Sequence, residues 1–252
     1  MSGTWIWFKK EWQEAWRTKR ILILLIVFLC FGIMSPLLAK LTPEIIKMSF
    51  ADFAGKIPKP TSLDSWGQFY KNMSQIGIYL AVILFSGSVS REVQKGTFLN
   101  FVTKGLSRRA IILGKWFSIS LQWLGVTVGA FLVTLLYTLI YFDDGKSQAV
   151  LSSLVCLLLF GILLLTVTLF ASTLLSSTGG LFLTIGVMVL LYVLNLFEGL
   201  KDWNPVSLIS IQPALLDGSA QLTTYTPALA VTLLGIILAL TATLGVFDKK
   251  AL

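Results

Sequence analysis

The fold of this chain is organised around the segment Ser90–Arg109, which reads SREVQKGTFLNFVTKGLSRR. It is a polar and strongly basic break between two apolar runs, each long enough to cross a bilayer. The pattern predicts a short helix over residues 97–103, with Thr97 as its capping residue. The apolar side chains of this helix recur at the i, i+3, i+4 spacing of one face; they are Phe98, Phe101 and Val102.

The residues that follow end this helix and start the next one. Gly105, after Lys104, suits the left-handed turn that commonly ends a helix. Ser107 can then cap a long apolar helix. A short amphipathic helix between two spans, on the basic side of a membrane, indicates a place where a soluble partner docks.

Composition places the chain among polytopic membrane proteins. Of its 252 residues 56% are hydrophobic and only 13% are charged, whereas soluble domains carry about 25% charged residues. The sequence therefore predicts an all-α fold in a single transmembrane domain over residues 1–252. The net charge of +8 could suggest nucleic acid. The charges lie in the loops between apolar runs, however, which is typical of contact with a lipid bilayer and not with nucleic acid.

The apolar runs predict six membrane-spanning helices, at residues 21–39, 73–89, 110–142, 150–175, 181–197 and 227–247. We expect Pro36 to kink or end the first of them. Residues 40–72 and 198–226 are expected to be external segments. The GxxxG pattern from Gly125 to Gly129 favours close packing within the chain.

Residues 4–20 precede the first span and carry four aromatic side chains at helical spacing, opposite charged ones. This pattern predicts an amphipathic elbow helix that lies in the membrane interface. The other reading is a plain charged leader before the first span.

The distribution of basic residues predicts the orientation. Thirteen of the 20 lysines and arginines fall on the side of both termini and residues 90–109, and seven fall on the other side over longer loops. By the positive-inside rule, both termini and residues 90–109 are expected to be cytoplasmic, in the cell membrane.

Several kinds of chemistry are missing from the sequence. No ionisable residue lies in the middle of any predicted span, which disfavours ion-coupled carriers. The chain has no histidine, and Cys30 and Cys156 lie within apolar runs, so neither a metal site nor a catalytic site is expected. The Walker A loop is also missing, because Ile140 stands where Gly145-Lys146-Ser147 would need a glycine. The chain is therefore not expected to be an enzyme, and any energy must come from a partner.

These motifs carry a family resemblance. Ser90-Arg91-Glu92, then Gly96-Thr97, a short apolar helix, Ser107-Arg108 and Gly114-Lys115 resemble the second-to-third span connection of type-2 ABC exporter permeases. The predicted elbow helix, six spans and cytoplasmic ends are also similar to that family. One departure is Lys104-Gly105-Leu106, where many members have a proline before Ser-Arg.

The resemblance implies a permease that pairs with a second permease chain, identical or related, and with two copies of an ABC ATPase subunit. ATP and Mg would bind the ATPase, and no cofactor would bind this chain. Residues 97–103 would be the coupling helix. Its docking residues would be Thr97, Phe98, Phe101 and Val102, supported by Arg91, Glu92 and Lys95. The resemblance also implies a pathway lined by the first, second and fifth spans, for which the candidates are Gln75, Tyr79, Ser86, Tyr192 and Asn195.

The neutral, aromatic and small polar character of these candidates favours an amphipathic or hydrophobic cargo, such as a membrane-active peptide, a lipid or a drug-like molecule, moved out of the cell. An alternative is a non-transporting membrane anchor for an ATPase. A third reading is an ion channel, which would conduct without ATP. The sequence does not discriminate between a homodimer and a heterodimer of permeases.

Overall fold

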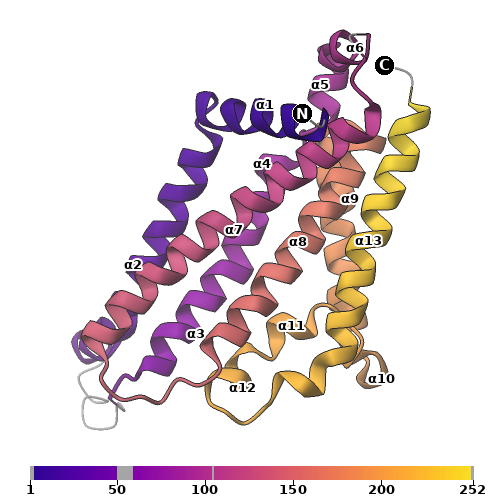
Figure 1. Ribbon diagram of the computed structural model, residues 1–252. Coiled ribbons are helices and arrows are strands. Elements are labelled where there is room, and N and C mark those ends of the chain that lie inside the picture. Colours follow the sequence, from indigo (N-terminus) through magenta and orange to yellow (C-terminus); the bar gives the residue numbers. More distant parts are fainter. Residues whose placement is uncertain (1–2, 50–58, 104, 251–252) are drawn as a thin grey trace.

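The computed structural model describes residues 3–49, 59–103 and 105–250, and within these ranges it consists of helices and turns without strands (Figure 1). Within this described part of the chain, six helices are long and apolar enough to cross a membrane. They are Arg20–Met48, Ser62–Gln94, Arg108–Tyr141, Val150–Leu174, Ser177–Leu194 and Leu222–Lys249. The predicted all-α fold with six transmembrane helices is confirmed.

The individual elements follow one another along the chain. The first half forms α1 (Gly3–Arg17), α2 (Arg20–Ser49), α3 (Ser62–Asn72), the π-helix η2 (Met73–Gly77), α4 (Ile78–Phe85), α5 (Ser90–Gln94) and α6 (Thr97–Val102). The second half forms α7 (Arg108–Tyr141), α8 (Val150–Leu174), α9 (Ser177–Leu194), α10 (Glu198–Lys201), α11 (Ser207–Ser210), α12 (Gln212–Leu216), the 3₁₀-helix η3 (Leu222–Tyr225) and α13 (Thr226–Lys249).

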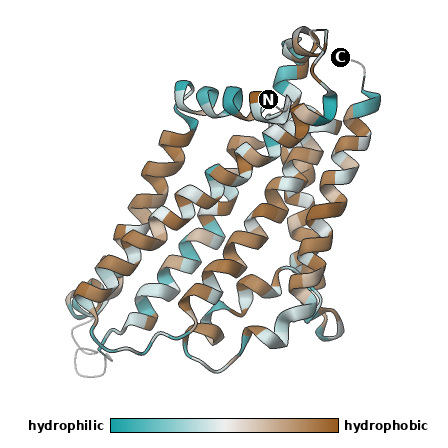
Figure 2. Ribbon diagram, viewed as in Figure 1, coloured by the Kyte–Doolittle hydropathy of each residue, from teal (hydrophilic) through white to brown (hydrophobic). Residues whose placement is uncertain are grey.

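Two long helices, α7 and α8, contact most of the other helices of the bundle (Figure 1). α7 contacts α1, α2, α3 and α13, and α8 contacts α4, α9, α11, α12 and α13. α1 lies across the bundle at the end where α5 and α6 project and where α13 ends (Figure 1). The spans are predominantly hydrophobic, whereas α1 is largely hydrophilic at its C-terminal end (Figure 2). This is the arrangement expected of a helix that lies on the membrane surface beside a set of spans.

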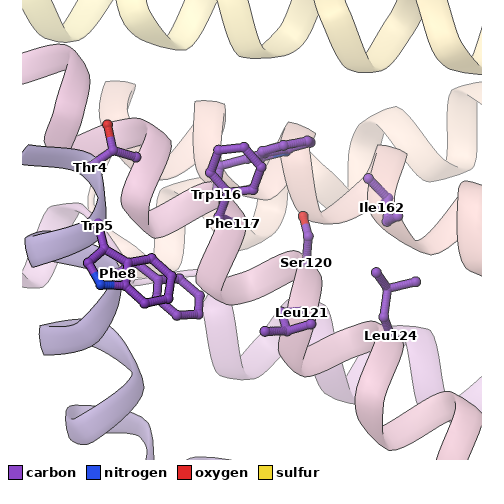
Figure 3. Close-up of a pocket in the computed structure, with 9 residues that line it drawn as sticks. All are labelled: Thr4, Trp5, Phe8, Trp116, Phe117, Ser120, Leu121, Leu124 and Ile162. Carbon is purple, nitrogen blue, oxygen red and sulfur yellow. The ribbon is translucent and has the colours of Figure 1, made fainter. Parts of the chain in front are cut away.

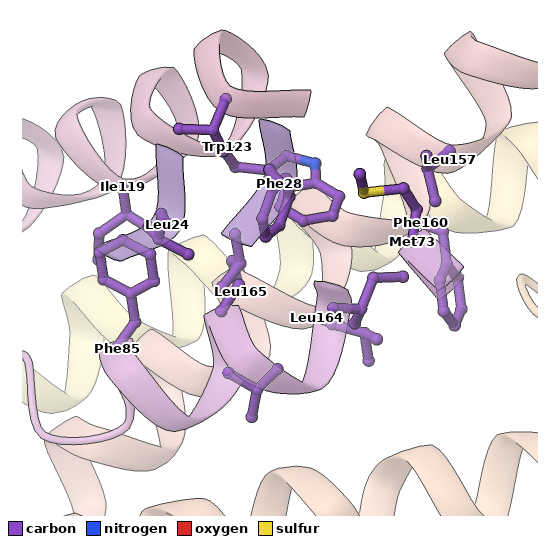
Figure 4. Close-up of a cluster of buried hydrophobic side chains, with 14 of the residues drawn as sticks. Leu24, Phe28, Met73, Phe85, Ile119, Trp123, Leu157, Phe160, Leu164 and Leu165 are labelled. Carbon is purple, nitrogen blue, oxygen red and sulfur yellow. The ribbon is translucent and has the colours of Figure 1, made fainter. Parts of the chain in front are cut away.

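Large side chains from α2, α7 and α8 meet in the core of the bundle (Figure 4). Phe28 contacts Trp123 edge to face, with 5.7 Å between ring centroids. Gly161 on α8 makes room for this contact, because a Cβ atom at that position would overlap the Trp123 indole. In contrast, a Cβ atom at Gly125 or Gly129 would meet no other described atom within 4 Å. The expectation that the GxxxG pattern packs closely within the chain is therefore wrong.

The first span is longer than predicted. α2 continues through Pro36 and Pro43 to Ser49, although residues 21–39 were expected to form the span. Proline at position 36 leaves the Gly32 carbonyl without its helical donor. The Thr134 hydroxyl of α7 lies 3.1 Å from that oxygen and can donate to it. The same hydroxyl lies 3.0 Å from the Ala130 carbonyl of its own helix, so the two carbonyl oxygens share its one proton. This side chain gives the Gly32 carbonyl a donor where α2 continues through Pro36.

The second span also begins earlier than predicted, at Ser62 instead of residue 73. Thr61 precedes α3, and its backbone N–H donates to Asp64 Oδ2 at 2.8 Å, as in a capping box. Trp66 and Phe69 of α3 are buried against Phe131 of α7. Part of the expected external segment 40–72 is therefore helix within the bundle, and residues 50–58 of it lie outside the described residues.

The other expected external segment, residues 198–226, also packs into the bundle. α11 and α12 contact α8, and Leu208, Ile211 and Leu215 are buried in one cluster with Cys156. The apolar runs within residues 198–226 are too short to cross a bilayer, so the sequence predicted an external segment there. The structure shows two short helices that fill the space between α3, α8 and α13.

Candidate functional site

The connection between the second and third spans is a compact helical hairpin. Gly96 precedes α6 with φ +65°, a conformation that favours glycine, and Thr97 makes no capping hydrogen bond. The prediction that Thr97 caps this helix is therefore wrong. Gly105 has φ +88°, and Ser107 Oγ accepts a hydrogen bond from the Ala110 N–H at 3.3 Å. Both of these expectations are confirmed, while Lys104 lies outside the described residues.

Phe98 anchors α6 to the rest of the chain. Its side chain is only 1% exposed and lies between Trp7 of α1 and Phe247 of α13, at centroid distances of 5.5 and 5.2 Å. Phe101 contacts Trp7 edge to face at 5.0 Å. Phe98 therefore does not lie on an outward face of α6, as the sequence suggested, because the helix turns this side toward α1 and α13.

The outward surface of α6 and α5 consists of other residues. Leu99 is 48% exposed, and the side chains of Arg91 and Lys95 are exposed beside it. Thr97, Phe101 and Val102 are half-buried. The sequence interpretation did not consider Leu99, although it is apolar and follows Phe98 directly on α6, about 100° around the helix.

A cluster of six charged side chains lies where α1, the start of α2, α5 and α7 meet; we call it the ion cluster. Its members are Lys10, Glu11, Glu14, Arg20, Glu92 and Lys115. Lys115 Nζ lies 2.7 Å from Glu11 Oε1 and 3.2 Å from Glu92 Oε1. Lys115 is 1% exposed, and Glu11 and Glu92 are also buried. Glu92 therefore joins α5 to α1 and α7 and does not face outward.

Lys10 occupies the centre of the carboxylates in this cluster. Its Nζ lies 3.2 Å from Glu11, 2.6 Å from Glu14 and 2.5 Å from Glu92. Oxygen atoms of the three carboxylates lie within 4.8 Å of one another, which is a spacing that could hold a metal ion. Because the Lys10 ammonium already contacts all three, the charge that a cation would supply is provided by the chain itself.

The ion cluster changes the protonation behaviour of α1. Burial acts to raise the pKa of Glu11, but the ammonium groups of Lys115 and Lys10 lower it from 4.5 to about 2. Burial acts to lower the pKa of Lys10, and Glu11 and Glu92 raise it above its ordinary value. Glu11 and Lys10 are therefore charged at neutral pH, and the cluster is held as a set of ion pairs.

The five pathway candidates do not form one group. Gln75 and Tyr192 line the same cavity of about 360 Å³ between α3, η2, α9, α11 and α12. Ser86 is buried and its hydroxyl lies 3.5 Å from that of Ser177. Asn195 accepts a hydrogen bond from Ser207 Oγ at 3.0 Å, and Tyr79 is exposed on α4. The structure brings Gln75 and Tyr192 together and leaves the other three apart from that cavity.

A second cavity is apolar and lies beneath α1 (Figure 3). It has a volume of about 510 Å³ and is formed by Trp5 and Phe8 of α1 with residues of α7 and α8. Phe117 and Leu121 on its wall are also exposed at the surface of the bundle. Apolar side chains that are exposed at this depth are expected to contact lipid.

The ion cluster was missed by the sequence interpretation, which considered Glu92 and Arg91 only as docking residues. One signal was available: Lys115 is a lone cation seven residues into the long apolar helix α7. A lysine in that position requires a carboxylate partner when it is buried. The partner, Glu11, is 104 residues away in the sequence, so only the fold identifies it.

Comparison with known proteins gives two findings. A family model described as "ABC-2 family transporter protein" matches residues 5–252. The chain is also 24% identical over 215 residues to "Uncharacterized transmembrane protein YxlG" of Bacillus subtilis (strain 168), an alignment that covers 79% of this chain and 80% of the relative.

Proposed function

The chain belongs to the ABC-2 transporter family and is a multi-pass permease subunit that works with an ABC ATPase, and on this premise we propose that it exports an amphipathic or hydrophobic cargo. In this proposal the end of the bundle that carries α1, α5 and α6 is cytoplasmic, and the protein resides in the cell membrane. Two permease chains combine with two ATPase subunits. ATP and Mg²⁺ bind the ATPase, and this chain has no catalytic role.

The observation that carries the proposal is the attachment of α6. The helix projects beyond the spans (Figure 1), and Phe98 and the ion cluster join its hairpin to α1, α7 and α13. A movement imposed on α6 would therefore be transmitted to three other helices. This is the mechanical requirement for a subunit whose energy comes from a partner.

The structure supports a revised docking surface. We propose that Leu99 contacts the ATPase directly, with Phe101, Val102 and Thr97 at the edge of the contact and Arg91 and Lys95 as polar support. Phe98 and Glu92 are removed from this surface, because both are buried within the chain. Their role is to hold the docking helix in position.

The mostly uncharged lining of the candidate pathway supports the proposed class of cargo. The cavity that contains Gln75 and Tyr192 is also lined by Tyr70, Ser74 and Gln212, with Lys71 as its one charged member. A lining of this kind suits a molecule with apolar and weakly polar groups better than one with many charges.

The test uses the permease and its ATPase reconstituted together in liposomes with the ATP site facing outward. An amphipathic peptide is expected to stimulate ATP hydrolysis and to accumulate inside the vesicles, because outward-facing ATPases make export from the cell appear as uptake. Stimulation by a charged oligosaccharide but not by the peptide would contradict the cargo class. A complex that assembles and hydrolyses ATP but moves no cargo would indicate a membrane anchor, and conductance without ATP would indicate a channel.

A further inference from the structure

A third cavity, of about 410 Å³, lies between the ion cluster and the start of α2, and we call it the cationic cavity. Five cationic side chains line it: Lys10, Arg20, Arg91, Lys95 and Lys115. Among the residues that the structure describes, two acidic side chains, Glu14 and Glu92, line it as well. Even when Glu11, which pairs with Lys10 and Lys115, is counted with the acids, five positive charges face three negative ones. The cavity therefore carries a surplus of positive charge.

Several donors in the cationic cavity have no acceptor among the described residues. Arg20 Nε and Nη2 are buried without a hydrogen bond, although Nη2 lies 4.0 Å from Glu11 Oε2. Ser88 Oγ is also buried and unpaired. Arg91 donates to Ser177 Oγ at 3.3 Å, and neither Arg91 nor Lys95 forms an ion pair in the described part of the chain. Buried donors without partners favour an acceptor that comes from outside the chain.

The walls of the cationic cavity change from polar to apolar along the spans. Ile23 of α2 and Leu84 of α4 line it. One helical turn further along the spans, Val27 and Leu80 are half-buried and continue the apolar surface. A ligand in this cavity would thus have an anionic group among the cations and an apolar part along α2 and α4.

We propose that the cationic cavity binds the phosphate group of an anionic phospholipid from the cytoplasmic leaflet, with one acyl chain along α2 and α4. Basic pockets between membrane helices on the cytoplasmic side bind anionic headgroups by this combination of charges and apolar surface. The phosphate oxygens accept hydrogen bonds from Arg20 and Ser88 and face the charges of Arg91 and Lys95. The lipid joins α2 to α5 and thereby stabilises the position of the hairpin that carries α6.

The inference goes beyond transport and depends only on the proposed orientation. Its test needs neither cargo nor ATPase. The full-length chain is stripped of lipid in a non-ionic detergent and titrated with phosphatidylglycerol, phosphatidylcholine or inorganic phosphate, and native mass spectrometry counts the ligands bound. We expect phosphatidylglycerol to bind at a stoichiometry of about one per chain and more tightly than phosphatidylcholine, because only the former carries net negative charge.

Two double variants separate the cavity from general surface charge. Arg91→Gln with Lys95→Gln removes two exposed cations of the cavity, and we expect it to weaken phosphatidylglycerol binding by about 30-fold. The matched control, Lys9→Gln with Arg17→Gln, removes two exposed cations of α1 that do not line the cavity. The control is expected to retain the affinity of the wild type. Because all four side chains are exposed, both variants are expected to fold.

Four results would overturn the inference. The first is equal affinity for phosphatidylcholine and phosphatidylglycerol, and the second is an equal loss in both double variants. The third is displacement of the lipid by inorganic phosphate at the same concentration, which would assign the site to a free anion. The fourth is release of the lipid when the ATPase is added, which would show that Arg91 and Lys95 support the ATPase contact alone and hold no lipid in the assembled transporter.

Discussion

The two ends of the bundle are held together by different interactions. At the end that carries α1, buried ion pairs join Glu11, Glu92 and Lys115 from three separate segments. At the opposite end, aromatic packing of Trp66 on Phe131 is combined with a hydrogen bond that the half-buried Asp144 carboxylate accepts from the Ser62 N–H. Buried ion pairs are sensitive to the loss of one partner, whereas apolar packing tolerates small shifts. The ion pairs therefore hold the end with α6 in one geometry, whereas the packing at the other end contributes mainly to stability.

The largest expected effect is at Lys115. We expect Lys115→Ala to lower the free energy of unfolding by about 4 kcal/mol, because the change leaves Glu11 and Glu92 buried with too little positive charge. The measurement is thermal or denaturant unfolding of the purified chain in detergent. The control, Lys71→Ala, removes an exposed lysine and is expected to have little effect. An equally small effect for both variants would mean that the ion cluster does not stabilise the α1 end.

At the opposite end, Trp66→Ala is expected to cost somewhat less, about 3 kcal/mol. The reason is the cavity left beside Phe69 and Phe131. We expect a smaller loss than for Lys115→Ala because the Trp66 side chain stays in an apolar environment when a membrane protein unfolds. The hydrophobic free energy of transfer from water therefore contributes little to the loss. The same unfolding assay applies. A loss larger than that of Lys115→Ala would reverse the comparison between the two ends.

The third prediction concerns the pH dependence of stability, which the ion pairs of Glu11 give to the end with α1. The pKa of Glu11 is about 2 in the folded chain and 4.5 ordinarily, so the unfolded state binds the proton more readily. The stability from Glu11 is therefore complete above about pH 4.5 and is lost as the pH falls toward 2. Unfolding midpoints measured across this window are expected to drop more steeply for the wild type than for Glu11→Gln. Parallel curves would contradict the ion pairing of Glu11.

The smallest effect is expected at the start of α3. Asp144 Oδ2 accepts a hydrogen bond from the Ser62 N–H at 2.8 Å and satisfies one of the free donors of that helix end. Asp144→Ala is expected to cost about 1 kcal/mol in the unfolding assay. Asp143→Ala is the control, because the neighbouring Asp143 is exposed. Equal losses in the two variants would show that general charge, and not the bond to Ser62, is responsible.

Much of the fold could be predicted because apolar runs longer than a bilayer leave few alternatives. The residues at which the spans begin and end were harder to predict. The capping pattern Thr61-x-x-Asp64 and the spacing of Trp66, Phe69 and Tyr70 are typical of a helix, but the sequence analysis did not use them and placed residues 40–72 outside the bundle. The continuation of α2 through Pro36 could not be predicted, because it depends on Thr134 of another helix.

The candidate site was predictable only where local pattern determines it. The existence of α6 and the caps at Gly105 and Ser107 followed from residue types at fixed spacing. The outward face of α6 could not be predicted in this way. Phe98 is buried by Trp7 and Phe247, which lie about 90 residues before it and about 150 residues after it in the sequence. The ion cluster was unpredictable for the same reason, since its partners come from three separate segments.

The most direct test of the central claim, that α6 docks the ATPase, is co-purification of the two proteins with Leu99→Asp. Leu200→Asp is the matched control, because Leu200 is equally exposed, at 48%, and lies on α10 at the opposite end. We expect Leu99→Asp to abolish copurification and ATP hydrolysis by the complex, and Leu200→Asp to retain both. A complex that assembles and hydrolyses ATP normally with Asp at position 99 would contradict the claim.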